Sequence, residues 1–346
     1  MVPAGPVRPD GTLLAVHAHP DDESLATGAL LATWAATAPV TLVTCTRGER
    51  GEVIDTPSHP TGLARLEGDG PALAAHRERE LAAALEALGV RDHLFLDRCG
   101  YEIDRSERVQ SGDLIPTADG GGQERYEDSG MVWVRPGIAG PAPDSGPTAF
   151  VRVPLDDAAA RLAGVVRARR PAVVATYEAG GGYGHPDHVR AHQVTVRALE
   201  LAADPAAAVV GTPWAVPERW EVVEPVAAVR AARRALGDDA AVRRLVAAHG
   251  LALADPDGAL PPVAVPQQEL ERSGRVTVDV APVLDQVLAA LAAHATQVQH
   301  AGRTNGADRH VLARYALSNG VLAPLLATAS LRRVPVAGTT PVGSAR

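Results

Sequence analysis

The stretch LLAVHAHPDDE at residues 13–23 decides the fold of this chain. Its first half is short, apolar and bounded by turn-forming residues, which is typical of a strand buried on both faces of a sheet. Asp21 or Asp22 can cap a following helix, because apolar residues then recur at helical spacing over residues 25–34. A second apolar run at residues 40–45 predicts another strand, so the chain opens with a β-α-β unit whose two strands pair in parallel.

Apolar periodicity continues through most of the chain, with one long interruption. It predicts helices at residues 72–88, 156–169, 186–201, 226–249 and 282–299, and strands at residues 94–96, 172–177 and 275–280. Between Cys99 and Phe150 the sequence is instead rich in Gly, Pro, Asp and Ser, and a stretch of this length is typical of a functional or disordered loop. We therefore predict an α/β protein with a Rossmann-like, mostly parallel sheet flanked by helices and a smaller C-terminal α+β part.

The residue pattern changes at about residue 205, where Pro-punctuated and Ala-rich segments begin. We predict a main α/β domain over residues 8–204 and a smaller C-terminal cap or substrate region over residues 205–333. Residues 334–346 are expected to form a flexible tail. A chain of 346 residues is long enough for a large core with such a second part.

Composition excludes several classes of function. The formal net charge is −8, so no diffuse basic surface is expected to bind nucleic acid. The sequence contains no lysine, which excludes a Schiff-base lysine, pyridoxal phosphate enzymes and lysine-dependent phosphate loops. We expect a small-molecule substrate rather than a macromolecular partner, and the sequence does not determine the oligomeric state.

The cysteine content and the lack of long apolar runs bear on the compartment. Cys45 and Cys99 are too few for a disulfide framework and too far apart for a paired-cysteine metal motif. No run approaches the roughly 20 apolar residues of a membrane span, and the first residues do not resemble a signal peptide. We therefore expect a soluble, cytoplasmic protein that does not associate with a membrane.

Two short runs of His, Pro and Asp each follow a predicted strand. The first is at residues 17–23 and the second at residues 184–188. Ligand sites of open parallel sheets form at the carboxyl ends of the strands, where the strand order reverses. His19, Asp22 and His188 can therefore supply three ligands to one divalent ion and leave a position open, as catalytic zinc sites do. Alternatively, each run is a helix-capping turn with a buried His. This interpretation is less favoured, because it requires the same coincidence at the ends of two strands.

The remaining polar residues of these runs suggest catalytic roles. A bound divalent ion lowers the pKa of water from 15.7 to about 7, and Asp21 is placed to act as its general base. His185 is expected to stabilise a developing oxyanion as a cation and to protonate an amine leaving group. Asp187 is expected to hold the His185 ring and raise its pKa, and Tyr183 to turn its hydroxyl toward the same oxyanion. We interpret His17 as a packed, hydrogen-bonded core histidine.

Three classes of protein fit this pattern. A hydrolase with one Zn²⁺ per chain is the leading hypothesis, and Fe²⁺ can fill the same ligand set. Two His and one carboxylate are also the facial ligands of non-haem iron oxygenases, but the parallel α/β fold and the adjacent Asp21 argue against that class. A silent sugar-binding module needs neither Asp21 nor His185, although both are present.

With these residues in view, the chain resembles the PIG-L/LmbE-like metal-dependent N-deacetylases, and among them those that act on N-acetylglucosaminyl-inositol in mycothiol biosynthesis. The resemblance rests on residues 17–23, 48–53, 77–90, 128–131, 181–188, 294–298 and 316–319. It implies an amide hydrolase that removes acetate from this sugar-inositol. It further implies the same zinc ligands and catalytic residues, a catalytic role for residues 8–204, and substrate contacts from Arg77, Asp128, Met131 and Asn319.

Some positions leave the choice of substrate open within this family. Met131 and Gly184 look like the deacetylase, whereas residues 188–193 look closer to a sister enzyme, the mycothiol S-conjugate amidase. Another N-acetyl sugar deacetylase is a further alternative. The stretch over residues 102–126 is longer than usual for these proteins, and Gly320 stands where an Asn is expected.

Overall fold

A computed structural model describes residues 5–7, 9–99, 125–135, 138–305 and 310–336. Most of the long loop predicted between Cys99 and Phe150, and most of the predicted tail, lie outside these ranges. None of the helices in the described ranges has both the length and the apolar character that crossing a bilayer requires.

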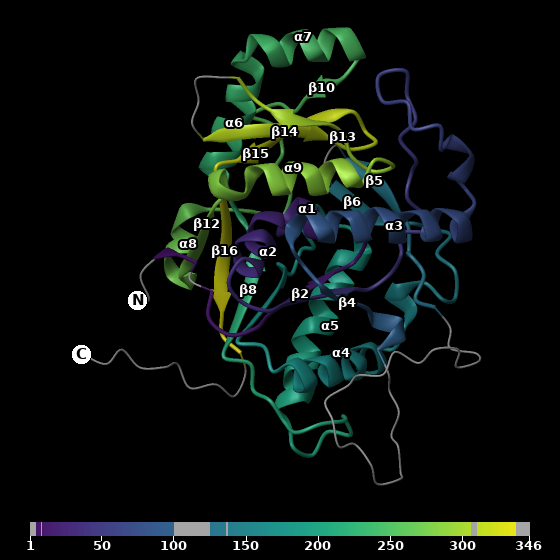
Figure 1. Ribbon diagram of the computed structural model, residues 1–346, viewed down its shortest axis with the longest axis vertical. Coiled ribbons are helices and arrows are strands. Elements are labelled where there is room, and N and C mark those ends of the chain that lie inside the picture. Colours follow the sequence, from purple (N-terminus) through teal and green to yellow (C-terminus); the bar gives the residue numbers. More distant parts are fainter. Residues whose placement is uncertain (1–4, 8, 100–124, 136–137, 306–309, 337–346) are drawn as a thin grey trace.

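A sheet of eight strands forms the centre of the structure that these ranges make up (Figure 1). Its strands, in spatial order, are β1 (Gly5–Pro6), β12 (Arg275–Asp279), β16 (Thr328–Val334), β8 (Glu218–Val222), β7 (Val173–Tyr177), β2 (Leu13–His17), β3 (Val40–Thr44) and β4 (Asp92–Phe95). The strands from β8 to β4 are parallel, and β16 runs antiparallel to both neighbours. The predicted α/β fold with a mostly parallel sheet is confirmed.

Helices cover both faces of this sheet. The α-helices are α1 (Asp22–Ala26), α2 (Gly28–Ala35), α3 (Gly70–Leu88), α4 (Leu155–Arg169), α5 (Pro186–Ala203), α6 (Val226–Asp238), α7 (Ala240–His249), α8 (Gln267–Ser273) and α9 (Leu284–Ala293). Helices α2, α3 and α9 pack on one face, and α4 and α5 on the other. Strand β2 is buried on both sides because Leu13 and Ala15 belong to one core and Leu14 and Val16 to the other.

Two of the helix predictions need correction. The helix predicted over residues 226–249 is two helices, because the Asp239 side chain accepts the N–H groups of Ala241 and Val242 and so caps α7 separately. The helix predicted over residues 282–299 ends at Ala293. Short 3-10 helices, for which the periodicity gives no signal, lie at Ala64–Leu66, Leu96–Arg98, Phe150–Arg152 and Ala281–Val283.

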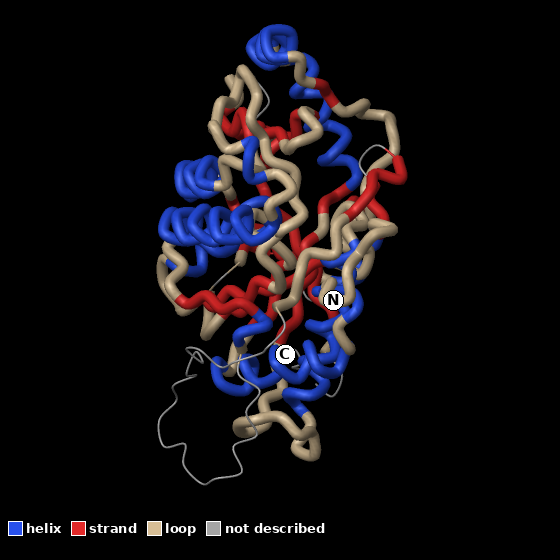
Figure 2. Tube along the Cα trace, turned by 90° about the vertical axis from the view of Figure 1, so that its right-hand side faces the viewer, coloured by secondary structure: helices blue, strands red, loops and turns tan. Residues whose placement is uncertain are grey.

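A second, four-stranded sheet lies with α6 and α7 at one end of the molecule (Figures 1 and 2). Its strands, in spatial order, are β10 (Ala252–Leu253), β15 (Val321–Leu326), β14 (Val311–Ala316) and β13 (Gln299–Arg303). Two further strand pairs are β11 (Ala264–Val265) with β9 (Glu224–Pro225), and β5 (Met131–Arg135) with β6 (Ile138–Pro141). The apolar pattern of the sequence predicts none of these strands.

The division of the chain at residue 205 stays a prediction. Strands β8, β12 and β16 come from the segment beyond that residue and extend the large sheet. The chain order within this sheet reverses between β2 and β7, since β3 and β4 follow β2 on one side while β8 follows β7 on the other. Loops that leave the carboxyl ends of β2 and β7 therefore meet at a switch point, where α/β sheets bind their ligands.

Candidate metal centre and active site

The two His/Asp runs follow β2 and β7, as the sequence predicts, and they come together at the switch point. Each is folded by its own local hydrogen bonds. The Asp22 carboxylate accepts the backbone N–H of His19 at 2.9 Å, which closes the turn after β2. At the other run, Nδ1 of His185 accepts the backbone N–H of Asp187 at 3.1 Å and caps α5. Asp21 occupies the N-cap position of α1, but neither it nor Asp22 caps that helix through its side chain.

The three predicted metal ligands lie together and are buried. One carboxylate oxygen of Asp22 is 3.3 Å from Nδ1 of His19, and the other is 3.2 Å from Nε2 of His188. The rings of His19 and His188 are 5.3 Å apart between centroids. The carboxylate of Asp22 thus bridges imidazoles that are 169 positions apart in the sequence (188 minus 19).

His19 belongs to two compact groups of possible metal-binding atoms. The atoms of His19, His185 and His188 lie within 4.8 Å of one another, and so do those of His19, Asp128 and Asp187. Asp128, predicted only as a substrate contact, therefore also lies among the possible metal-binding atoms, with its carboxylate 3.7 Å from Nε2 of His19. No local pattern signals this position, since residue 128 lies in the stretch without periodicity.

The donor set fits a divalent cation. Asp22, Asp128 and Asp187 bring three buried carboxylates to a site with three imidazoles. Among the described residues, Nδ1 of His188 and Oδ1 of Asp187 have no hydrogen-bond partner, and Nε2 of His188 only approaches the Asp22 carboxylate at 3.2 Å. Buried polar atoms are rarely left unpaired unless a ligand or ion satisfies them. Nitrogen and oxygen donors in this mixture suit zinc or iron(II).

Charge attraction dominates the protonation of this cluster. Burial alone would raise the pKa of Asp22, but the facing His188 and His19 hold it well below its usual range. Burial likewise opposes a charged His19, yet Asp128, Asp187 and Asp22 raise its pKa well above the ordinary value. The Asp22 carboxylate is thus charged and available as a ligand.

The structure corrects the predicted partner of Asp187. Its carboxylate lies 3.2 Å from Nε2 of His19 and accepts the backbone N–H of Ser129 at 2.9 Å, whereas only its backbone N–H contacts His185. Carboxylates that hold the second nitrogen of a metal-ligating imidazole fix the orientation of that ring. Asp187 is therefore suited to orient His19.

The surroundings of His185 disfavour the predicted cation. Burial, together with nearby His19 and His188, holds the pKa of His185 well below its usual value. The ring is neutral, and its Nδ1 accepts a hydrogen bond from Asp187, so the single ring proton belongs to Nε2. His185 can donate a hydrogen bond from that nitrogen without being a cation.

Replacing Asp187 with Ala tests its support of His19. We expect the variant to bind the divalent ion about 10–100-fold more weakly, which is the usual effect of removing such a carboxylate. Competition with a metal-chelating dye at fixed pH measures the change. Asp156→Ala, at an exposed ion pair with Arg197, is the control. Unchanged metal affinity in Asp187→Ala would contradict the orienting role.

Arg77 holds both the carboxylate of Asp21 and the backbone of the loop that carries it. Nη2 of Arg77 is 3.1 Å from its carboxylate, and the same guanidinium donates to the carbonyl oxygens of Pro20 and Gly48. Burial raises the pKa of Asp21 to about 6, although the charge of Arg77 opposes this rise. A carboxylate with a pKa near neutrality suits a general base. A Cβ at Gly48 would overlap Nη1 of Arg77, so the approach requires glycine there.

The other predicted residues occupy different parts of the site. The Tyr183 ring lies 5.1 Å from that of His188, and burial raises the pKa of its hydroxyl, so the hydroxyl stays protonated. Arg77 is only 2% exposed and contacts the loop of Asp21. His17 is buried against Thr27, to which Nε2 makes a 2.8 Å hydrogen bond, and burial lowers its pKa to about 4. The interpretation of His17 as a core histidine agrees with this environment.

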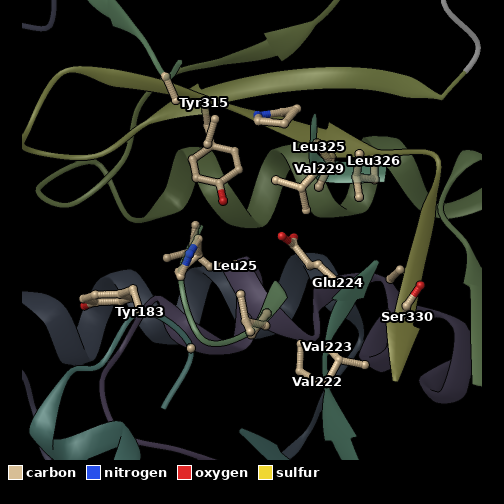
Figure 3. Close-up of a pocket in the computed structure, with 18 of the residues that line it drawn as sticks. Leu25, Tyr183, Val222, Val223, Glu224, Val229, Tyr315, Leu325, Leu326 and Ser330 are labelled. Carbon is tan, nitrogen blue, oxygen red and sulfur yellow. The ribbon is translucent and has the colours of Figure 1, made fainter. Parts of the chain in front are cut away.

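Two cavities border the centre and differ in character. One, of about 480 Å³, is lined by polar side chains that include Glu49, Arg50 and Asp128. The other, of about 730 Å³, adjoins Asp22 and His188 and has mostly aliphatic walls. Figure 3 shows this second cavity between the β14 and β15 strands above and the ends of β8 and α1 below.

The predicted substrate contacts divide between these regions. Asp128 lines the polar cavity, whereas Asn319 lies on the exposed rim of the apolar one, where it accepts the N–H of Val321. Met131 begins β5 three residues after Asp128. The contacts of these residues with a substrate stay predictions.

The fold and the donor cluster together define an α/β protein with a buried cluster of imidazoles and carboxylates at the switch point of its sheet. Residues 14–199 match the model of the PIG-L family, described as GlcNAc-PI de-N-acetylase. This range spans more than half of the chain, and the chain belongs to that family.

Relatives with high sequence identity carry a common name, 1D-myo-inositol 2-acetamido-2-deoxy-alpha-D-glucopyranoside deacetylase. The protein of that name from Kineococcus radiotolerans is 46% identical over 316 residues, which cover 90% of this chain and 74% of the relative. The one from Streptomyces avermitilis is 40% identical over 325 residues, with coverage of 92% and 90%. A solved structure of a conserved Thermus thermophilus protein is 21% identical, covers 82% of this chain and 79% of its own, and has a TM-score of 0.43.

Proposed function

We propose that this protein removes acetate from N-acetylglucosaminyl-inositol, the deacetylation that the names of its relatives give for those proteins, and that it needs zinc to do so. The observation that supports the chemistry most directly is the meeting of His19, Asp22 and His188 beside Asp21. We propose the first three as metal ligands. A divalent ion held by these residues would polarise the amide carbonyl and lower the pKa of a bound water.

Asp21 begins the reaction by taking a proton from the attacking water, whose oxygen bonds to the carbonyl carbon. The hydroxyl of Tyr183 and the Nε2–H of His185 donate hydrogen bonds to the oxygen of that carbonyl as negative charge develops on it. Protonated Asp21 then passes its proton to the sugar nitrogen as the carbon–nitrogen bond breaks, which yields acetate and a free amine. A neutral His185 supplies no proton in this scheme, since its pKa is held low.

The polar cavity is suited to the sugar-inositol part of the substrate. Hydroxyl groups need donors and acceptors, and Glu49, Arg50, Glu52 and Asp128 line this cavity. Asp128 also approaches His19, so a hydroxyl held by this carboxylate is close to the reacting amide. We place the reaction in the cytoplasm, because both cysteines are buried and unpaired.

The apolar cavity favours a second candidate substrate. An acetyl methyl group fills only a small part of about 730 Å³, and aliphatic walls do not suit a sugar. The Glu224 carboxylate and the Tyr315 hydroxyl point into the cavity from facing walls, so polar groups of a larger acyl part can be held there (Figure 3). The conjugate amide of mycothiol has such a larger acyl part, so the amidase is the second candidate.

Competing turnover of the two substrates tests this assignment. We expect the zinc-loaded protein to release one acetate and one free amine per N-acetylglucosaminyl-inositol consumed, and to process this substrate faster than a mycothiol S-conjugate. Acetate by enzymatic assay and amine by fluorescent labelling measure both products. Faster cleavage of the conjugate would make the amidase the main activity, and no cleavage of either amide would remove the proposed function.

A further inference from the structure

The backbone of Asp21 is in a conformation that few side chains tolerate. Its φ is 133° and its ψ is −34°. Two other described residues with side chains have positive φ, Arg170 at 47° and His300 at 54°, and both values fall in the usual left-handed range. Asp21 lies well outside that range, so its conformation persists only if neighbouring groups hold it.

The Glu23 carboxylate provides such a hold. One of its oxygens accepts the backbone N–H of Asp21 at 2.9 Å, while the other accepts the hydroxyl of Ser24 at 2.6 Å and lies 2.7 Å from Nε2 of His294. A hydrogen bond between a charged carboxylate and a backbone N–H is stronger than a neutral one. The strained peptide group is thus anchored through Glu23 to His294.

His294 comes from a distant part of the chain that is itself fixed. It follows α9, and the next residues bind the loop and helix around Asp21. The side chain and N–H of Thr296 both donate to the Glu80 carboxylate on α3, and the carbonyl of Thr296 accepts the N–H of Ile54. Because α3 also carries Arg77, one helix positions both the His294 segment and the Asp21 carboxylate.

The buried ion pair between Glu23 and His294 does more than fill space in the core. Both side chains of Glu23 and His294 are 0% exposed. Well-packed apolar residues of similar volume are often as stabilising as a buried ion pair, so stability alone does not account for this pair. The second carboxylate oxygen of Glu23 accepts the backbone N–H of Asp21. Full burial also means that neither side chain can touch a substrate.

We propose that Glu23 and His294 are positioning residues that hold the backbone of Asp21 so that its carboxylate faces the metal centre. This inference rests on the proposed role of Asp21 as general base. It predicts that residues from the C-terminal part of the chain set the rate of the chemical step without contacting the substrate.

The test compares His294→Leu with His294→Gln. Leu cannot bind the Glu23 carboxylate, whereas the amide of Gln can donate to it. We expect His294→Leu to lower kcat at least about tenfold, with KM and bound metal near the parental values, and His294→Gln to regain most of that loss. His93→Leu, which removes a partly buried histidine bonded to Thr44, is the control and should leave kcat within about twofold.

A double-variant cycle separates positioning from a general loss of structure. In an Asp21→Asn background, His294→Leu should change the residual kcat by less than about twofold, because the group that it positions is already gone. An equal fold loss in both backgrounds, or an unchanged kcat for His294→Leu, would overturn the proposal. If His294→Leu does not fold, Glu23→Asp replaces it, since the shorter carboxylate keeps its charge but cannot reach both partners.

The same measurements distinguish the proposed base from its proposed supports. An Asp21→Asn variant with full turnover would remove the general-base assignment and the positioning role with it. If Asp21→Asn is inactive while the separate variants Glu23→Asp and His294→Leu are fully active, only the positioning role is removed.

Discussion

Asp21→Asn is expected to lower kcat for N-acetylglucosaminyl-inositol by about 10²–10⁴-fold while the protein keeps its metal. Asp21 precedes Asp22 in the chain, but its carboxylate contacts Arg77, whereas the carboxylate of Asp22 contacts the imidazole of His19. An amide in its place cannot accept the proton of the attacking water. Steady-state kinetics of the metal-replete variant, with metal content by elemental analysis, measure the effect.

The control for this substitution is a surface aspartate in an ion pair. Asp285 is 86% exposed and pairs with Arg303, so Asp285→Asn should keep its parental kcat. A loss of bound metal in Asp21→Asn as large as the loss of activity would instead identify Asp21 as a ligand. Full activity of the variant would exclude it as the base.

His188→Ala is expected to abolish stable metal binding and to lower turnover by at least about a thousandfold. Stabilisation of transition-state charge by a catalytic ion is worth several kcal/mol, and each 1.36 kcal/mol corresponds to a factor of ten in rate. The one polar contact of the His188 ring among the described residues is the 3.2 Å approach of Nε2 to the Asp22 carboxylate, which is itself a proposed ligand. Metal content after dialysis and single-turnover rates check this result.

His249→Ala is the matched control, because His249 is an exposed residue at the end of α7. Its metal content and turnover should equal those of the parent. Retention of tightly bound metal in His188→Ala would contradict the proposed ligand set. In that case His19, Asp128 and Asp187, which form a compact group of their own, would be the alternative ligands.

The centre of the sheet could be predicted from the sequence because the relevant signals are local. Continuous apolar runs mark β2, β3 and β7, and the residues that follow them must lie at one edge of a parallel sheet. That rule alone predicts that His19 and His188 lie close together, and their rings are neighbours in the fold. The family prediction from the matching segments is confirmed.

Other features depend on contacts that no local pattern encodes. Strands β13 to β15 pair with one another rather than with the large sheet, and their short mixed sequences resemble loops. His294 falls within a predicted helix, and its bond to Glu23 spans 271 positions. Proximity in sequence favours His185 as the partner of Asp187, yet the fold turns the Asp187 carboxylate toward His19.

Strand β16 has a consequence for biosynthesis of the protein. It lies between β8 and β12, although it follows both of them in the chain. Until residues 328–334 leave the ribosome, β8 has an open edge with unpaired backbone groups, and such edges recruit strands from other chains. A chain arrested before this point is therefore prone to aggregate, so chaperone protection matters most late in translation.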